Sequence, residues 1–315
     1  MSDETTTEYY HEDTNRFLEA LSHTAAGTGF SKRLIEKDYY CSILLQDFTP
    51  LFEKGLVFKG GTSLSKIHIE FFRLSEDLDF GASVKAEASR TTRREAIAPV
   101  KNHLTELTNR LPFIAEKVTL SGHNNNSQYN AEFTYLSSIT GEQEAIKFEA
   151  SLREETLLPV ENLRAKTALI DPLTGLSVIE PFQVQTLSLI EAYAEKARAA
   201  LTRREPAIRD YFDIEIAAQR GLIRQDTPEF LALVSQKLRI TSDPVNISDK
   251  RVEDLRRQLE AQLKPRPSAC RLCSLFFGPS NQTRPRNQRR LEQQPFSRAA
   301  SHRIMLTQLS FSEGS

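Results

Sequence analysis

The residue types and spacings that could do chemistry gather between residues 58 and 80. A short apolar run ends in Gly60-Gly61, and Thr62-Ser63 follow at once as the expected start of a helix. Glycines allow a backbone to come close to a ligand, and the first amides of a helix are unpaired and positive. Such a turn is typical of a phosphate cradle. Taken alone it is weak evidence, because many turns contain Gly-Gly-Thr.

Two aspartates sharpen this prediction. Asp77 and Asp79 are two positions apart on a predicted short strand, so both side chains leave the same face. Carboxylates held this close repel each other unless a cation lies between them. Mg²⁺ usually takes one or two carboxylates together with substrate phosphates. In isolation, Asp77 could cap a turn and Asp79 could be a solvated edge residue, but the glycine turn directly upstream favours the metal site.

A third carboxylate is expected on a neighbouring strand. In residues 146–151 apolar side chains alternate with Lys147, Glu149 and Ser151, so Lys147 and Glu149 share one face. Glu149 is the candidate for the third acid of the set. An ordinary half-buried strand with a solvated face would show the same alternation.

The C-terminal half offers further polar groups on predicted helices. On a helix over residues 184–203, Lys196 lies about 140° from the centre of the apolar stripe, free to face a cleft or solvent. Asp210 and Asp213 share one face of the next helix, which begins at Pro206. Without further context these two aspartates are predicted to be surface charges.

The elements that must position these residues form an α+β front half followed by an all-helical back half. Strands are predicted at 56–58, 78–80, 129–136 and 145–152, with a polar loop at 124–127. Helices are predicted at 8–23, at 31–46 with Ser31 as N-cap, from the glycine turn to 69, and at 91–110, 184–203, 206–220, 227–240 and 248–263.

Pro172, Gly175 and Pro181 interrupt regular structure and indicate the boundary between these halves. We therefore expect three regions in a chain of 315 residues. They are a core with N-terminal helices over residues 1–175, a helical domain over 176–264 that completes the active-site cleft, and an atypical tail over 265–315.

Composition predicts a globular protein of the cytoplasm. The chain is 39% hydrophobic and 26% charged, which is close to average soluble usage. It has no apolar run of the roughly 20 residues that a bilayer span needs, so no membrane association is expected. The acidic N-terminus lacks the layout of a signal peptide. Cys270 and Cys273 have Cys-x-x-Cys spacing, but no second pair lies near them, which disfavours a zinc or redox role.

The net charge of −1 hides an asymmetry. Residues 265–315 contain eight Arg, no Lys and two Glu, a charge of +6, which leaves −7 for residues 1–264. A basic segment can bind nucleic acid by releasing counterions. The same segment is rich in Pro, Ser, Gln and Asn, a composition typical of disorder, and its loss of Lys also fits a changed reading frame. It is assigned no catalytic role.

Taken together, these residues resemble the AbiEii/AbiGii-type nucleotidyltransferase toxins of the DNA polymerase β-like nucleotidyltransferase superfamily. The glycine turn and the paired aspartates are shared by the wider superfamily, whereas the Glu-Lys and Arg-Asp-x-x-Asp blocks narrow the resemblance to this family. The similar blocks are Glu36-Lys37-Asp38-Tyr39, Phe58–Leu64, Arg73–Phe80, Ile146–Glu149, Glu195-Lys196 and Arg209–Asp213. The resemblance implies the nucleotidyltransferase fold, a small mixed sheet flanked by helices.

The resemblance also implies roles for the site residues. Asp77 and Asp79 would carry Mg²⁺ with Glu149 as a third ligand, although relatives often have Asp at that position. Lys196 would contact phosphate, and Asp210 would act in the same cleft as a catalytic or positioning acid. The nucleoside triphosphate (NTP) would be held by the glycine turn and its flanks, namely Lys59, Gly60, Gly61, Thr62, Ser63 and Arg73.

The implied activity is Mg²⁺-dependent transfer of a nucleoside monophosphate from an NTP to an RNA acceptor, a tRNA. The implied setting is the toxin of an abortive-infection, type IV toxin–antitoxin system with a separately encoded antitoxin. Two alternatives stay open: transfer to a protein hydroxyl, and a catalytically degenerate domain that binds a nucleotide or a partner. Retention of the glycines, the aspartates and Lys196 together argues against degeneration.

Overall fold

The computed structural model describes residues 9–69, 71–82, 84–85, 87–241, 244–245 and 248–262. The tail over 265–315, with Cys270 and Cys273, lies outside the described residues. The chain divides into two compact units, Met1–Ala192 and Tyr193–Ser315.

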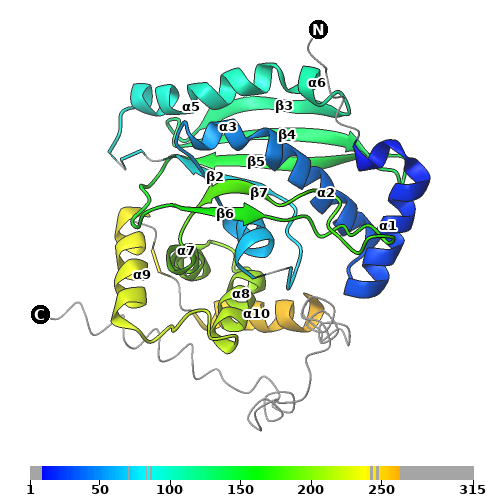
Figure 1. Cartoon of the computed structure of the whole chain (residues 1–315). Helices are drawn as coiled ribbons and strands as arrows, with labels where there is room; N and C mark the ends of the chain where they lie inside the picture. Colours follow the sequence, from blue (N-terminus) through cyan, green and yellow to red (C-terminus); the bar gives the residue numbers. More distant parts are fainter. Residues whose placement is uncertain are drawn as a thin grey trace, which may run out of the picture. The chain divides into compact units, whose positions relative to one another are not determined.

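The first unit is built on a mixed seven-stranded sheet with the order β3-β4-β5-β2-β1-β7-β6 (Figure 1). Strands β2 and β5 pair in parallel, as do β1 and β7, and the other neighbours are antiparallel. The strands are β1 (Leu56–Lys59), β2 (Leu78–Ala82), β3 (Ile114–His123), β4 (Gln128–Leu136), β5 (Gln143–Ser151), β6 (Glu161–Ala165) and β7 (Phe182–Thr186).

Helices surround this sheet, and side-chain caps begin the first two α-helices. Asp13 accepts a hydrogen bond from the Arg16 amide at 3.0 Å, and Ser31 accepts one from the Leu34 amide at 3.3 Å, as the sequence predicted for Ser31. The helices are η1 (Tyr10–Glu12), α1 (Thr14–Thr28), α2 (Lys32–Asp47), α3 (Thr49–Phe52), α4 (Gly60–Ser63), the π-helical turn η2 (Leu64–His68), α5 (Arg90–Thr105) and α6 (Leu107–Arg110).

The core lies on one face of the sheet, and the residues between core positions along a strand point to the opposite face. Leu78, Phe80 and Ala82 of β2 are buried, and Phe80 stacks on Phe148 of β5 with ring centroids 5.0 Å apart. Side chains alternate along a strand. Asp79, between two core residues of β2, therefore faces away from the core.

A buried ion pair joins α2 to η2. The Lys66 ammonium donates to Asp38 Oδ1 at 2.6 Å and to Ser42 Oγ at 2.6 Å, and both charged residues are about 1% exposed. Asp38 Oδ2 accepts from the Ala168 amide at 2.8 Å and from the Thr167 hydroxyl at 3.1 Å. Buried charges are tolerated only when they are paired and hydrogen-bonded in this way. The segment that follows the glycine turn is thereby fixed to the N-terminal helices.

The neighbouring residues of α2 anchor two other segments. Glu36 is fully buried and accepts hydrogen bonds from Ser137 Oγ at 2.6 Å and the Ser138 amide at 2.7 Å, in the turn between β4 and β5. Lys37 donates to Glu76 at 2.9 Å, immediately before Asp77. The Glu-Lys-Asp block of α2 is thus a scaffold for the segments around the glycine turn.

One predicted helix begins too early. Residues 182–186 form β7, which pairs with β1 and β6, and the next helix, α7 (Leu189–Thr202), starts only after it. Within β7, Val184 and Thr186 are buried, while the other three residues of the strand are less buried. This alternation has the period of a strand and a β-branched inner face. Strands β3 and β6 were also missed, whereas the polar loop at 124–127 was predicted correctly.

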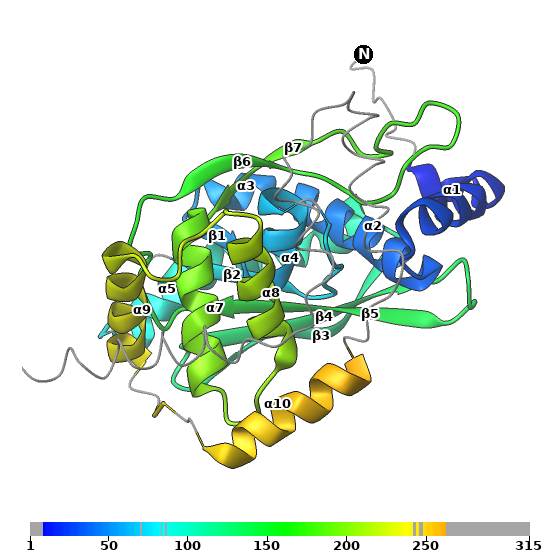
Figure 2. The ribbon, with the colours of Figure 1, turned by 90° about the horizontal axis from the view of Figure 1, so that it is seen from below.

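After α7 the described elements are α8 (Ile208–Gln219), α9 (Pro228–Thr241) and α10 (Asp249–Gln262). Figure 2 shows these helices from below, together with α4 against β1 and β2. Among the described residues, none of the helices combines the length and apolar character needed to cross a membrane.

The buried pair generates a stability prediction. Lys66→Met keeps the side chain's length but leaves the Asp38 carboxylate buried without its cation, so we expect a loss of roughly 3–5 kcal/mol in the free energy of unfolding. Arg33→Met is the control, because Arg33 pairs with Glu144 at 2.7 Å while its side chain is 57% exposed. That substitution should cost less than about 1 kcal/mol. Urea unfolding of both variants measures the difference, and equal losses would contradict the role given to Lys66.

Candidate active site

The glycine turn and the second aspartate touch because of the strand register. Lys59 pairs with Asp79 across the antiparallel β1–β2 ladder, and Gly60 follows directly. Gly60 has a φ of +75°, and a Cβ added there would lie 2.2 Å from Asp79 Oδ2. A side chain at this position would overlap the carboxylate. Gly60 is therefore required both for its left-handed backbone and for the space that Asp79 occupies.

The second glycine is covered by the segment that leads to the aspartates. A Cβ at Gly61 would lie 2.9 Å from an Arg73 guanidinium nitrogen and 2.9 Å from Ser75 Oγ. Arg73, a predicted nucleotide contact, thus lies beside the turn. Ser75 was not singled out from the sequence, and only this packing against Gly61 reveals it.

The hydroxyls of the turn are engaged within the protein. Thr62 Oγ1 donates to the Asp77 carbonyl oxygen, and Ser63 Oγ lies 2.7 Å from Thr186 Oγ1, which in turn donates to the Phe58 carbonyl at 2.9 Å. Thr62 and Ser63 are both buried. These bonds hold the turn to Asp77 on one side and to β7 on the other. What the turn offers to a ligand is backbone rather than hydroxyl groups.

Polar residues form a row across four strands. Asp79 pairs with Lys59 on one side and with Glu149 on the other, and Glu149 pairs with Asn130. Residues opposite each other on neighbouring strands point to the same face. The row therefore reads Lys59, Asp79, Glu149, Asn130, and sequence reasoning had identified its first three members.

The first aspartate lies just outside this row. Asp77 is the residue before β2 begins, and not a member of the strand as predicted. Within the described part of the chain, no group of three or more His, Cys, Asp or Glu side chains is arranged to hold a metal ion. Asp77, Asp79 and Glu149 are thus neighbours in the fold and do not form a three-carboxylate cage by themselves.

In the second unit, the reading of Asp210 and Asp213 as surface charges was wrong. Both aspartates are fully buried, and the Lys196 ammonium lies 2.9 Å from Asp210 Oδ1 and 2.9 Å from Asp213 Oδ2. Lys196 itself is 11% exposed. A buried carboxylate needs a cation or several donors, so Lys196 of α7 and the two acids of α8 form one ion-paired cluster.

Two further cations form ion pairs next to this cluster. Arg203 Nε lies 3.1 Å from Asp210 Oδ2, and Lys237 of α9 lies 3.4 Å from the carboxylate of Glu195. Arg203 was missed, although it stands seven positions after Lys196 and so on the same side of the helix. The Glu195-Lys196 block therefore has two separate tasks. Glu195 binds α9, and Lys196 binds α8.

The described cysteine is not a nucleophile. Cys41 is fully buried on α2, where its thiol points toward the Glu76 carbonyl at 3.8 Å. Burial raises the pKa of the Cys41 thiol to about 12. A thiol with that pKa stays protonated at neutral pH, so covalent catalysis by Cys41 is excluded.

A comparison with known protein families identifies the family of this chain. The family model described as the nucleotidyl transferase AbiEii toxin of type IV toxin–antitoxin systems matches residues 43–272, well over half of the chain. The chain belongs to this family. The matched AbiEii region contains the glycine turn, both aspartates, Glu149 and the Lys196 cluster, while the Glu36–Tyr39 block lies before it.

Two solved structures match this AbiEii protein over most of both chains. JHP933 from Helicobacter pylori is 19% identical with a TM-score of 0.40, and the alignment covers 82% of this chain and 88% of that one. A second H. pylori protein, described as a candidate nucleotidyltransferase, is 20% identical with a TM-score of 0.42, over 82% of this chain and 91% of that one. The comparison with curated proteins gives no match. By its family, the chain is a nucleotidyltransferase toxin, a class that implies a nucleotide substrate and an antitoxin partner.

The close approach of Gly60 to Asp79 can be tested with a matched pair of glycines. Gly60 and Gly55 both have positive φ values, +75° and +91°, but a Cβ at Gly55 would have nothing within 4 Å. An alanine at either site costs roughly 1–2 kcal/mol of backbone strain, and only Gly60→Ala also displaces the Asp79 carboxylate. We expect Gly60→Ala to lower nucleotidyl transfer about 100-fold. Gly55→Ala should keep nearly full transfer activity, and an equal loss in both variants would refute the steric argument.

Proposed function

We propose that this AbiEii protein transfers a nucleoside monophosphate from an NTP to an RNA acceptor, a tRNA, in a Mg²⁺-dependent reaction in the cytoplasm. In this proposal it acts as the toxin of an abortive-infection, type IV toxin–antitoxin system, and a separately encoded antitoxin restrains it. The observation that carries the proposal is the contact between Gly60 and the Asp79 carboxylate, beside Asp77.

The donor set of this site suits Mg²⁺. Asp77 and Asp79 offer carboxylate oxygens, and a hard divalent ion takes one or two such groups plus substrate phosphates and water. A complete protein cage is not required for this mode of binding, in keeping with the absence of a three-carboxylate group among the described residues. When bound, the ion would supply charge neutralisation at the triphosphate and lower the pKa of the attacking hydroxyl. Glu149, opposite Asp79 in the register, is proposed as the additional acid.

The chain's own residues would position the triphosphate. Lys59 stands opposite Asp79, and Arg73 lies against Gly61, so positive charge flanks the turn on two sides. Backbone amides at Gly60–Ser63 would donate hydrogen bonds to phosphate oxygens, because the local hydroxyls are already engaged. These groups bind and orient the donor nucleotide before any bond changes.

In the second unit we assign Lys196 to phosphate contact and Asp210 to positioning. The Lys196 ammonium lies 2.9 Å from each of two buried carboxylates, which hold it in one place. Such a fixed cation can stabilise the negative charge that develops on a departing pyrophosphate. Arg203 lies 3.1 Å from the other carboxylate oxygen of Asp210. Its positive charge, added to that of Lys196, offsets the two negative charges of Asp210 and Asp213.

The decisive experiment follows a labelled nucleotide. The purified chain is incubated with each α-labelled NTP, Mg²⁺ and total cellular RNA, and the label is traced to RNA, to protein or to neither. We expect label in the tRNA fraction and none after chelation of Mg²⁺. Label in protein would establish transfer to a protein hydroxyl instead, and absence of transfer would favour a catalytically degenerate domain.

Substitution of the aspartates tests the same mechanism. Asp77→Asn and Asp79→Asn preserve shape and remove the charge that would hold Mg²⁺, so we expect each to reduce transfer by at least about 1000-fold. Asp226→Asn is the matched control, because Asp226 is 60% exposed and pairs only loosely with Arg224 at 3.5 Å. Circular dichroism should show all three variants folded. Full transfer activity in either site variant would rule out this mechanism.

A further inference from the structure

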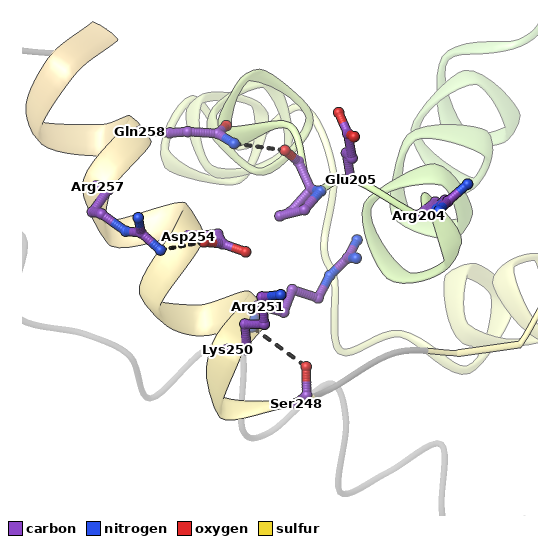
Figure 3. Close-up of a pocket in the computed structure, with 9 residues that line it drawn as sticks. Arg204, Glu205, Ser248, Lys250, Arg251, Asp254, Arg257 and Gln258 are labelled. Atoms are coloured by element: carbon purple, nitrogen blue, oxygen red, sulfur yellow. Dashed lines mark hydrogen bonds and ion pairs between the residues drawn. The ribbon is translucent and has the colours of Figure 1, made fainter.

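A pocket lined mainly by charged and polar residues lies in the second unit, apart from the Lys196 ion pairs. Residues 204–206, between α7 and α8, form one wall, and residues of α10 form the other (Figure 3). Its volume of about 600 Å³ falls within the range of small-molecule pockets, roughly 300–1,000 Å³.

The lining of the pocket selects for an anion. It contains four cationic side chains against the two carboxylates of Glu205 and Asp254, and Pro206 is its one apolar member among the described residues. Arginine forks match the oxygens of phosphate in pairs, so a phosphate group is the ligand that this lining suits.

The floor of the pocket is rigid. Arg251 is only 4% exposed, and its guanidinium donates to the carbonyl oxygens of Arg203, at 2.7 Å, and of Ala200. Gln258 accepts from the Ile208 amide at 2.9 Å and donates to the Pro206 carbonyl at 2.8 Å. The side chains of Arg251 and Gln258 are therefore engaged in hydrogen bonds within the protein, and these bonds hold the connection between α7 and α8 in place.

The remaining cations are available to a ligand. Arg204 and Lys250 form no ion pair with another described residue, and Arg257 pairs with Asp254 while its side chain stays 67% exposed. Arg204 also follows Arg203, the residue that pairs with the buried Asp210. A phosphate in the pocket would thus be held next to the segment that carries the Lys196 and Asp210 cluster.

We propose that this pocket binds a backbone phosphate of the polynucleotide acceptor, an inference that rests on the proposed function. A polynucleotide is favoured over a single small anion because the proposed reaction uses a polyanionic acceptor, and three cationic side chains of the pocket, Arg204, Lys250 and Arg257, can each contact a phosphate. A polyanion that makes several such contacts releases counterions from each.

Two adjacent arginines of α10 provide the test. Arg256 and Arg257 are 66% and 67% exposed, and each pairs with the acid three residues earlier, but only Arg257 lines the pocket. Arg257→Gln and Lys250→Gln should each lower RNA affinity about 5- to 10-fold near 0.1 M salt, the effect of one lost phosphate contact. Each should also reduce the slope of log K against log salt by roughly 0.7–0.9. Arg256→Gln should change neither quantity appreciably.

The measurement is fluorescence anisotropy of labelled tRNA on the full chain, together with separate KM values for RNA and NTP. An unchanged KM for NTP is expected in all three variants. A raised KM for NTP with unaltered RNA binding would assign the pocket to the donor nucleotide and overturn the proposal, as would equal effects in Arg256→Gln and Arg257→Gln. If the wild-type chain binds RNA through Arg257 without modifying it, the proposed reaction fails while the pocket assignment stands.

Discussion

The structure of the candidate site depends on the lack of a side chain at Gly60. The Asp79 carboxylate occupies the space that a Cβ would fill, and the β1–β2 register brings the two residues to the same point. Every other feature of the site supports this approach. Thr62 holds the Asp77 carbonyl, Ser63 is bonded to Thr186, and Arg73 and Ser75 pack over Gly61. In the proposed site, the missing side chain leaves the Asp79 carboxylate in contact with the turn that would hold phosphate.

The α2 helix explains how the polar side of such a corner is held in place beside the hydrophobic core. Three successive charged residues, Glu36, Lys37 and Asp38, reach the β4–β5 turn, Glu76 and Lys66 respectively. In the second unit the same principle recurs, because buried acids of α8 hold Lys196. Paired buried charges cost desolvation energy and give little net stability. Their value here is geometric, since each pair fixes a side chain or segment that the proposed chemistry requires.

Local patterns in the sequence predicted part of this arrangement. Gly60, Asp77 and Asp79 were brought together from spacing alone, because a strand, a glycine turn that begins a short helix, and a second strand leave few alternatives. Asp210 and Asp213 were wrongly predicted to be exposed. Their burial depends on Lys196 of α7 and on Arg203, which directly follows α7. Strand β7 was read as a helix because the apolar residues that follow it continue the helical pattern back into it. Contacts between distant segments, such as Asp38 with Lys66, leave no local signal at all.

The π-helical turn at Leu64–His68 has a consequence for how this chain can vary. Its wider hydrogen-bonded ring closes from the Ile69 amide to the Leu64 carbonyl at 3.0 Å and accommodates one residue more than an α-helical ring. Loss of one residue would restore ordinary helical winding and change the positions of the residues inside the turn. Lys66 would then leave its buried partners. We expect the spacing between the glycines and the aspartates to resist insertions and deletions, while the β3–β4 turn, with three left-handed asparagines in succession, can change length freely.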